Sequence, residues 1–281
     1  MSESVELNRR RALSVVAVTA IGGALVSQRA FAAETGAAAA DAAALISGAD
    51  VCMITPETTE GPYYFDPSLE RVDITEGHPG VPASIQLQVV DVACKPASGA
   101  RVDIWHCDAA GLYSGYAGQG DDQQTSTVGK TFLRGTQFTD ASGVAAFTSI
   151  YPGWYRGRTT HIHFKVFLNK VDVLTGQIFF PDALSQFIYE RVPPYARKAA
   201  RDTLNAGDGI AAQATRGSFA YVKELADKYL VAMIIGVDPK AVSGGATPGA
   251  PPPVGPGGPP PGGGDAAGSA GSLVPGVAGV K

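Results

Sequence analysis

The middle of the chain contains short runs of β-branched and aromatic residues separated by turn signals. Runs of this kind predict β-strands, and we expect them at residues 85–92, 101–107, 132–139, 144–150, 161–168, 177–180 and 229–237. Residues 181–205 read as helical or irregular, with Asp182 as a helix N-cap. This pattern predicts a mainly β fold, an antiparallel β-sandwich with irregular loops and one or two short helices.

Residues 1–33 have the three-part pattern of a signal peptide. Arginines at 9–11 are followed by an apolar run at 15–26 and by small residues at 30–33. The adjacent arginines favour the twin-arginine route, which exports folded proteins. The apolar run is shorter than the about 20 residues of a comfortable membrane span. We therefore expect export to the periplasm or the extracellular space with no stable membrane insertion after signal removal; an N-terminal anchor helix is the alternative.

Composition divides the remaining chain into three parts. Residues 34–50 are an alanine-rich linker, and residues 51–240 are expected to fold as one domain of about 190 residues. Residues 241–281 are dominated by Gly, Pro and Ala, with too few large apolar groups to offset the entropy lost on ordering, so we expect a disordered tail. A formal net charge of −4 supplies no basic surface for phosphates, and nucleic acid is not an expected partner. The oligomeric state stays open.

The three cysteines are Cys52, Cys94 and Cys107, so at most one internal disulfide can form. If 85–92 and 101–107 are the strands of one hairpin, Cys94 and Cys107 lie on the order of 20 Å apart. That exceeds the limit of about 7 Å between the α-carbons of a disulfide. Any disulfide is therefore expected to involve Cys52, and the alternative is three buried free thiols.

His161 and His163 lie on a predicted strand with Ile162 between them. Because side chains alternate along a strand, both imidazoles point to one face and Ile162 points to the other. The pair could ligate a metal ion, or it could lie on a solvated strand face. The other two histidines, His78 and His106, are interpreted as ordinary polar residues.

Two tyrosines lie in turns beside predicted strands. Tyr155 belongs to the turn at 151–158, which leads directly into the histidine strand, and Tyr113 ends a second turn at 108–113. Loops held by rigid strands often carry reactive groups. Each tyrosine alone could equally be a half-buried aromatic whose hydroxyl reaches water.

Three sequence blocks then occur in a fixed order. They are TPETTEGPYY at 55–64, VDIWHCD with a following Gly and Tyr at 102–113, and PGWY followed by RTTHIHF at 152–164. Together these blocks resemble the intradiol ring-cleavage dioxygenases, of the protocatechuate 3,4-dioxygenase type and especially its exported single-chain group. The resemblance covers about residues 55 to 239 and makes residues 51–240 a catalytic domain of that type.

The resemblance implies an Fe(III) cofactor held by two tyrosines and two histidines, namely Tyr113, Tyr155, His161 and His163. Two phenolates and a hydroxide neutralise the three charges of Fe(III) in a pocket of low dielectric constant, whereas zinc would leave excess negative charge. Hard oxygen ligands combined with imidazole also favour ferric iron. The resemblance further implies that Tyr155 is the ligand that leaves and takes a proton from the substrate.

Further roles also follow from the resemblance. Arg158 is expected to stabilise negative charge on the bound ring, although strand parity would turn it away from the metal, so the strand should begin after Arg158 or bulge there. Gln177 is expected near the iron, or else as an exposed polar residue of a strand. The substrate pocket is expected to be lined by Gly61, Pro62 and Tyr63, which a simple turn would also explain.

The leading hypothesis is an exported non-haem Fe(III) intradiol dioxygenase. It would use O2 to cleave a small aromatic diol of the catechol type between its two hydroxyl-bearing carbons, giving a muconic acid. The alternative is an exported non-enzymatic β-sandwich binding module with a structural metal or no metal. The sequence does not distinguish catechol, hydroxyquinol, protocatechuate and lignin-derived diols as substrates.

Overall fold

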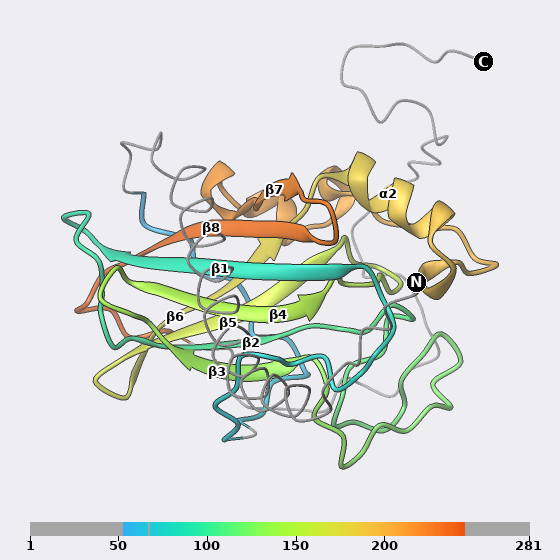
Figure 1. The fold of residues 1–281 in the computed structure, drawn as a ribbon, viewed down its shortest axis with the longest axis horizontal. Helices are drawn as coiled ribbons and strands as arrows, with labels where there is room; N and C mark the ends of the chain where they lie inside the picture. The colour runs from blue at the N-terminus through green and yellow to red at the C-terminus, as the bar shows by residue number, and fades with distance from the viewer. Residues whose placement is uncertain (1–52, 67, 245–281) are drawn as a thin grey trace, which may run out of the picture. The chain divides into compact units, whose positions relative to one another are not determined.

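The computed structural model describes residues 53–66 and 68–244. Within them, two four-stranded sheets and one α-helix are formed (Figure 1). The first sheet has the order β4-β1-β8-β7, with β1 at Pro82–Asp91, β4 at Val144–Ile150, β7 at Tyr221–Glu224 and β8 at Tyr229–Val237. The second has the order β3-β2-β5-β6, with β2 at Arg101–Trp105, β3 at Arg134–Phe138, β5 at His161–Leu168 and β6 at Val171–Phe179.

Helix α2, Asp182–Arg191, follows β6, and four single-turn 3-10 helices come after it. These are η1 at Pro193–Tyr195, η2 at Asn205–Gly207, η3 at Ala211–Gln213 and η4 at Arg216–Ser218. The N-cap of α2 is Pro181 rather than the expected Asp182. The Asp182 carboxylate instead accepts hydrogen bonds from Arg201 and from the Asn205 backbone N–H, so it ties the helix to the segment that follows.

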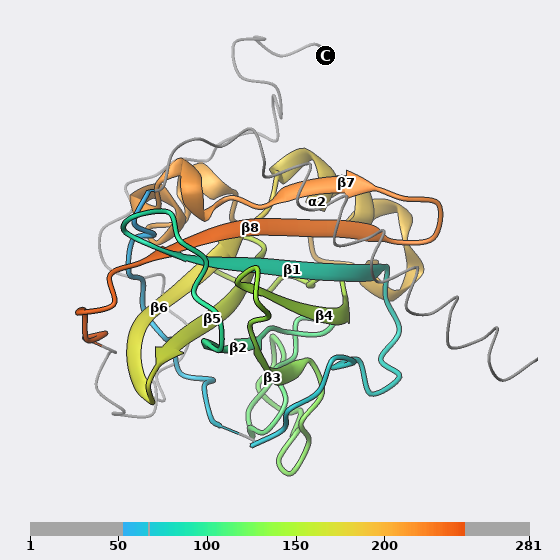
Figure 2. The same ribbon diagram turned by 60° about the vertical axis from the view of Figure 1, so that its left-hand side comes forward.

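The predicted antiparallel β-sandwich is confirmed, with one exception in strand direction. All strand pairs within the two sheets are antiparallel except β1 and β8, which run parallel (Figure 2). Strands β4, β5 and β8 have the predicted bounds, whereas β6 begins six residues before the predicted 177. Strand β7 was not predicted, because its four residues are partly or fully exposed and lack a clear apolar alternation.

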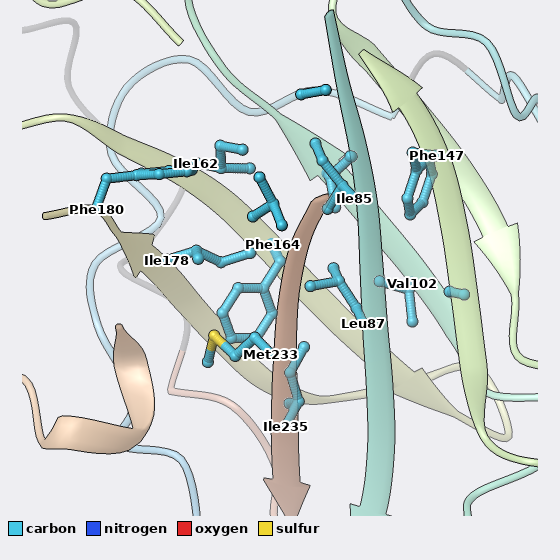
Figure 3. Close-up of a cluster of buried hydrophobic side chains, with 14 of the residues drawn as sticks. Ile85, Leu87, Val102, Phe147, Ile162, Phe164, Ile178, Phe180, Met233 and Ile235 are labelled. Carbon is cyan, nitrogen blue, oxygen red and sulfur yellow. The ribbon is translucent and has the colours of Figure 1, made fainter. Parts of the chain in front are cut away.

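The two sheets pack face to face around a single large apolar cluster. Figure 3 shows side chains of β1 and β8 meeting side chains of β5. On β5, Ile162 and Phe164 point into this cluster. Gly176 lies opposite Phe164 on β6, where an added Cβ would come 2.2 Å from the Phe164 Cζ atom, so only glycine leaves room for the ring.

The other face of the second sheet is covered by residues 55–66, here called the N-terminal strap. Lys165 points to this face and pairs at 2.7 Å with both Glu60 of the strap and Asp172 of β6. Tyr64 donates a hydrogen bond to Asp103 of β2 at 2.9 Å. The strap therefore adds partners for buried charged groups of the sheet, beside those that the sheet itself supplies.

The strands on either side of Cys94 do not form the hairpin that was assumed in the cysteine argument. Strands β1 and β2 lie in different sheets, so the single hairpin assumed for residues 85–107 is wrong. Cys94 is disulfide-bonded and Cys107 is a buried free thiol. A Cys94–Cys107 bond is thus excluded, as expected, although for a different topological reason.

The expected signal peptide at 1–33 and linker at 34–50 lie outside the described residues, as does the expected tail beyond residue 244. These boundaries stay predictions. Over residues 53–66 and 68–244, the structure contains no helix with the length and apolar character needed to cross a bilayer.

His106 links the two layers. Its side chain is fully buried, with Nδ1 2.8 Å from the Cys107 carbonyl oxygen and Nε2 2.7 Å from Ser149 Oγ on β4. Because a carbonyl only accepts hydrogen bonds, Nδ1 carries the proton. Burial lowers the pKa of His106 to about 4, so it is a neutral structural group.

This burial predicts a pH dependence of stability. The unfolded chain protonates His106 below pH about 6.5, whereas the folded chain keeps it neutral down to about 4. Between these values unfolding takes up a proton, so stability is lost as pH falls, by at most about 1.4 kcal/mol per pH unit for this one group. His106→Gln should flatten the slope of the unfolding free energy against pH in this window. Urea unfolding of the wild type and of His106→Gln at several pH values measures this slope for each protein. Equal slopes in the two proteins would contradict the assignment.

Candidate metal centre

Four polar side-chain atoms converge at one end of β5. The Nε2 atom of His161 lies 3.1 Å from Nε2 of His163, 3.1 Å from Oη of Tyr155 and 3.3 Å from Oη of Tyr113. The two phenol oxygens are 3.5 Å apart. Side chains from two loops and one strand thus meet at a single point, here called the donor cluster.

Strand alternation places both histidines in the donor cluster. His161 and His163 lie on the face of β5 opposite the core-facing Ile162. The Nδ1 atom of His161 lies 2.7 Å from the Thr159 carbonyl oxygen and must donate to it. Nε2 of His161 therefore carries a lone pair toward the donor cluster. Trp105 of β2 stacks on His163 at 4.8 Å between centroids and fixes the plane of that ring.

Glycine lets the two tyrosine turns approach each other. Gly111 precedes Tyr113 by two residues, has φ of +85° and lies against the Trp154 carbonyl next to Tyr155, where an added Cβ would be 2.2 Å from the oxygen. Tyr113 is 1% exposed, and the Tyr63 ring stacks on it at 4.6 Å. Tyr155 is only partly buried.

The donor cluster fits a first-row metal ion. Bonds of about 2.1 Å give ligand separations of about 3.0 Å at right angles and about 3.4 Å at tetrahedral angles, which match the observed 3.1–3.5 Å. Within residues 53–66 and 68–244, no three His, Cys, Asp or Glu side chains gather as a metal site. A metal held here would therefore need the phenol oxygens.

Burial controls the charge of these four groups. It lowers the pKa of His161 to about 3 and that of His163 well below its ordinary value. It also raises the pKa of Tyr113 and Tyr155 above the ordinary value for a phenol. Imidazole binds metals in its neutral form, whereas a buried phenol ionises only beside a strong Lewis acid. The donor set suits a highly charged cation.

Arg158 reaches the donor cluster from the turn before β5. The strand begins at His161, after Arg158, as the parity argument predicts. Its Nη1 atom lies 3.4 Å from Nε2 of His161, and Nη2 donates to Oε1 of Gln177 at 2.5 Å. Its Nε donates to Asp208 at 2.8 Å. Arg158 is thus held by two side chains beside the donor cluster.

Gln177 lies opposite His163 in the β5–β6 pair and is 1% exposed. The alternative of an exposed polar residue is therefore wrong. Its Nε2 donates to the Thr59 carbonyl oxygen at 3.0 Å. Gln177 connects Arg158 to the N-terminal strap.

The three expected pocket residues of the strap have different surroundings. Gly61 has φ of +71°, and an added Cβ would lie 3.3 Å from Cε1 of His163. Tyr63 lines a cavity of about 400 Å³ together with Tyr113 and Tyr155. Pro62 is exposed, and neither Pro62 nor Gly61 is part of the cavity lining. The structure thus brings Gly61 and Tyr63, but not Pro62, to the site.

The cavity extends from the two tyrosines to a polar rim. Arg156 and Asp121 face each other there at 3.5 Å. Arg197 also lines the cavity and donates to the carbonyls of Ala110 and Trp154. Arg197 lies far from the motifs in sequence, and no pattern marked it as a site residue.

Two further buried charges were not predicted. Arg134 of β3 is 1% exposed and donates to Ser114 Oγ, to the Ser114 carbonyl and to the Tyr63 carbonyl. It therefore fixes the residue whose ring covers Tyr113. Asp208, 2% exposed, binds Arg158 from a loop 50 residues away. Neither residue stands in a pattern that signals its contacts.

Comparisons with known proteins agree on one family. A dioxygenase family model matches residues 59–206, more than half of the chain. The solved intradiol ring-cleavage dioxygenase of Tetranychus urticae is similar at a TM-score of 0.63 and 32% identity, over 69% of this chain and 98% of that one.

Two curated relatives are similar over shorter stretches. Catechol 1,2-dioxygenase of Pseudomonas sp. (strain EST1001) is 36% identical over 122 residues, which is 42% of this chain and 36% of the relative. The protocatechuate 3,4-dioxygenase beta chain of Burkholderia cepacia is 32% identical over 152 residues, 50% of this chain and 61% of the relative. The chain thus spans between about a third and three fifths of these relatives. Fold, matched segment and relatives confirm the predicted resemblance, and the chain belongs to the intradiol ring-cleavage dioxygenase family.

Proposed function

We propose that this protein is a non-haem Fe(III) intradiol dioxygenase that cleaves a catechol-type ring between its two hydroxyl-bearing carbons. The observation that carries this proposal is that His161 Nε2 lies 3.1–3.3 Å from His163 Nε2 and from the two phenol oxygens of Tyr113 and Tyr155. The two tyrosines line a cavity of about 400 Å³. Membership of the family supports the reaction class. The diol and O2 combine into a muconic acid, so all atoms of both reactants are retained in the product.

Three side chains are assigned to hold the metal throughout. Tyr113, His161 and His163 are almost completely buried, and their rings are fixed by stacking or by hydrogen bonds to the backbone. When bound, Fe(III) would act as a Lewis acid that orients and polarises the diol. The preorganised ligands keep their positions while a substrate enters and leaves.

Tyr155 is assigned to exchange with the substrate. It lines the cavity and is less buried than Tyr113. On release, its phenolate oxygen would take the proton of an incoming hydroxyl group, because both groups are phenols of similar basicity. No external base is then needed inside the cavity.

Arg158 is assigned to stabilise negative charge that develops on the ring. Its guanidinium lies at the donor cluster and stays protonated, since the pKa of Arg158 is raised by the nearby Tyr155 and Asp208 despite the opposing effect of burial. A fixed cation of this kind is most effective where water is excluded. Gln177 orients it by accepting from Nη2.

We also propose that the protein is exported through the twin-arginine route. The support is the pattern of residues 1–33. A route for folded proteins would let the four side chains of the donor cluster bind iron before export.

The reaction is tested with the full chain loaded with iron. Oxygen uptake should follow addition of a catechol, with a muconic acid as product and both added oxygen atoms derived from 18O2. The same assay with protocatechuate and hydroxyquinol defines the substrate. Removal of iron should abolish uptake, and Fe(III), but not Zn²⁺, should restore it. A colourless zinc protein without uptake would support the binding-module alternative instead.

Tyr155→Phe tests the exchanging ligand. Loss of one phenolate should change the visible charge-transfer absorption of the iron-loaded protein and lower kcat for ring cleavage by at least about tenfold, a loss typical of a missing proton-transfer group. Tyr116→Phe is the matched control, because its hydroxyl binds the Tyr64 carbonyl outside the donor cluster. An unchanged spectrum and rate in Tyr155→Phe would refute the assignment.

Replacing both Arg10 and Arg11 with lysine tests the export route. The twin-arginine pair is read by a receptor as an address, so the variant should accumulate as uncleaved precursor in the cytoplasm. Fractionation followed by mass spectrometry of the N-terminus measures this. Normal export of the variant would exclude the twin-arginine route.

A further inference from the structure

Asp208 is a buried carboxylate whose two oxygens are both fully engaged. Its Oδ2 atom accepts hydrogen bonds from Arg158 Nε at 2.8 Å and from the Thr159 backbone N–H at 2.8 Å. Its Oδ1 atom accepts from the backbone N–H groups of Ile210 at 2.8 Å and Ala211 at 3.1 Å. The side chain is 1% exposed. One carboxylate therefore joins the turn before β5 to the start of η3.

The contact lies within a larger clamp on that turn. Gly157 donates its backbone N–H to Asp202 at 3.1 Å, and Thr159 Oγ1 donates to Oδ1 of Asn205 at 2.8 Å. Three consecutive residues of the turn are thus held by the segment 202–208. Of these contacts, only that of Asp208 is made to a side chain that itself extends to the donor cluster, the side chain of Arg158.

The guanidinium of Arg158 is fixed from two sides. Asp208 binds Nε and Gln177 binds Nη2, and these two contacts determine the plane of a rigid fork. Nη1 is then directed toward His161 Nε2 at 3.4 Å. Gln177 is neutral, so Asp208 is the only one of the two anchors that also compensates the charge of the buried arginine.

We propose that Asp208 is a positioning residue for the ring-cleavage reaction. It holds Arg158 so that Nη1 faces the donor cluster and the substrate bound there. Both oxygens of Asp208 are engaged by protein donors and its side chain is buried, so it acts through Arg158 without touching the substrate. The inference rests on the proposed function, in which Arg158 stabilises charge on the ring.

A purely structural role is the competing explanation, because Asp208 Oδ1 also accepts hydrogen bonds from the backbone N–H groups of Ile210 and Ala211 at the start of η3. The two explanations predict different energetic coupling between substitutions at Asp208 and at Arg158. If Asp208 acts through Arg158, its replacement should cost little more activity once Arg158 is already replaced. If Asp208 only supports the fold, the two losses should add.

The experiment is a double-mutant cycle on the iron-loaded full chain, with Asp208→Asn, Arg158→Gln and the double variant. Asp208→Asn should lower kcat/KM by about 10- to 100-fold, the range seen when an orienting partner is removed from a metal site. The loss should fall on kcat with KM little changed, because the charge on the ring develops during the reaction. In the Arg158→Gln background the same change should have almost no further effect. Asp202→Asn, which alters the carboxylate bound to Gly157, is the matched control and should retain wild-type activity.

Anaerobic titration with 4-nitrocatechol, followed by its absorption change, reports substrate binding in every variant without turnover. Iron content and thermal unfolding are measured alongside. Additive losses in kcat, or loss of iron in Asp208→Asn, would overturn the positioning role while leaving the proposed function intact. A wild-type protein that neither binds the diol nor consumes O2 would overturn the proposed function itself.

Asp208→Glu keeps the carboxylate but displaces it by one methylene group, and it serves as a second variant if Asp208→Asn does not fold. It should show the same coupling to Arg158 with a smaller loss. Failure of both variants to fold would assign Asp208 to stability and overturn the proposal.

Discussion

The site depends on one constraint, which is that β5 is buried on both faces. Ile162 and Phe164 fill the core between the sheets, so the alternating His161 and His163 are forced to the opposite face. That face is covered by the N-terminal strap and not by water. Polar groups there must find partners within the protein, since an unpaired buried polar group is costly. The ion pairs of Lys165 with Glu60 and Asp172 satisfy this requirement away from the donor cluster.

The same burial prepares the donor cluster for a cation. Desolvation keeps His161 and His163 neutral, and it keeps Tyr113 and Tyr155 protonated. Neutral imidazoles gain from a metal at once, whereas each phenol must first lose a proton. A highly charged ion is the partner that makes this ionisation favourable inside a protein. Two buried phenols therefore suit a highly charged ion better than a softer or less charged one, because nothing else in the donor cluster could stabilise two phenolates.

Local patterns predicted those parts of the fold and site that depend on neighbours in sequence. Strands β4, β5 and β8 followed from apolar runs, and the shared face of His161 and His163 followed from a period of two. The tyrosines required the family resemblance, because nothing local distinguishes a metal-binding phenol from a half-buried one. The assumed pairing of β1 with β2 was wrong, because strand partners are chosen by the packing of whole sheets.

Local sequence patterns could not predict ion pairs between residues far apart in the chain, for a physical reason. A carboxylate that neutralises a buried arginine needs only to be close in space, so its distance along the chain is unconstrained. Asp208 meets Arg158 across 50 residues, through a loop without periodicity. The family model ends at residue 206, and Asp208 belongs to none of the three sequence blocks that carry the resemblance, so neither one marks it. The arginine nevertheless accounts for its place, since a guanidinium held in a dry site requires a nearby negative charge.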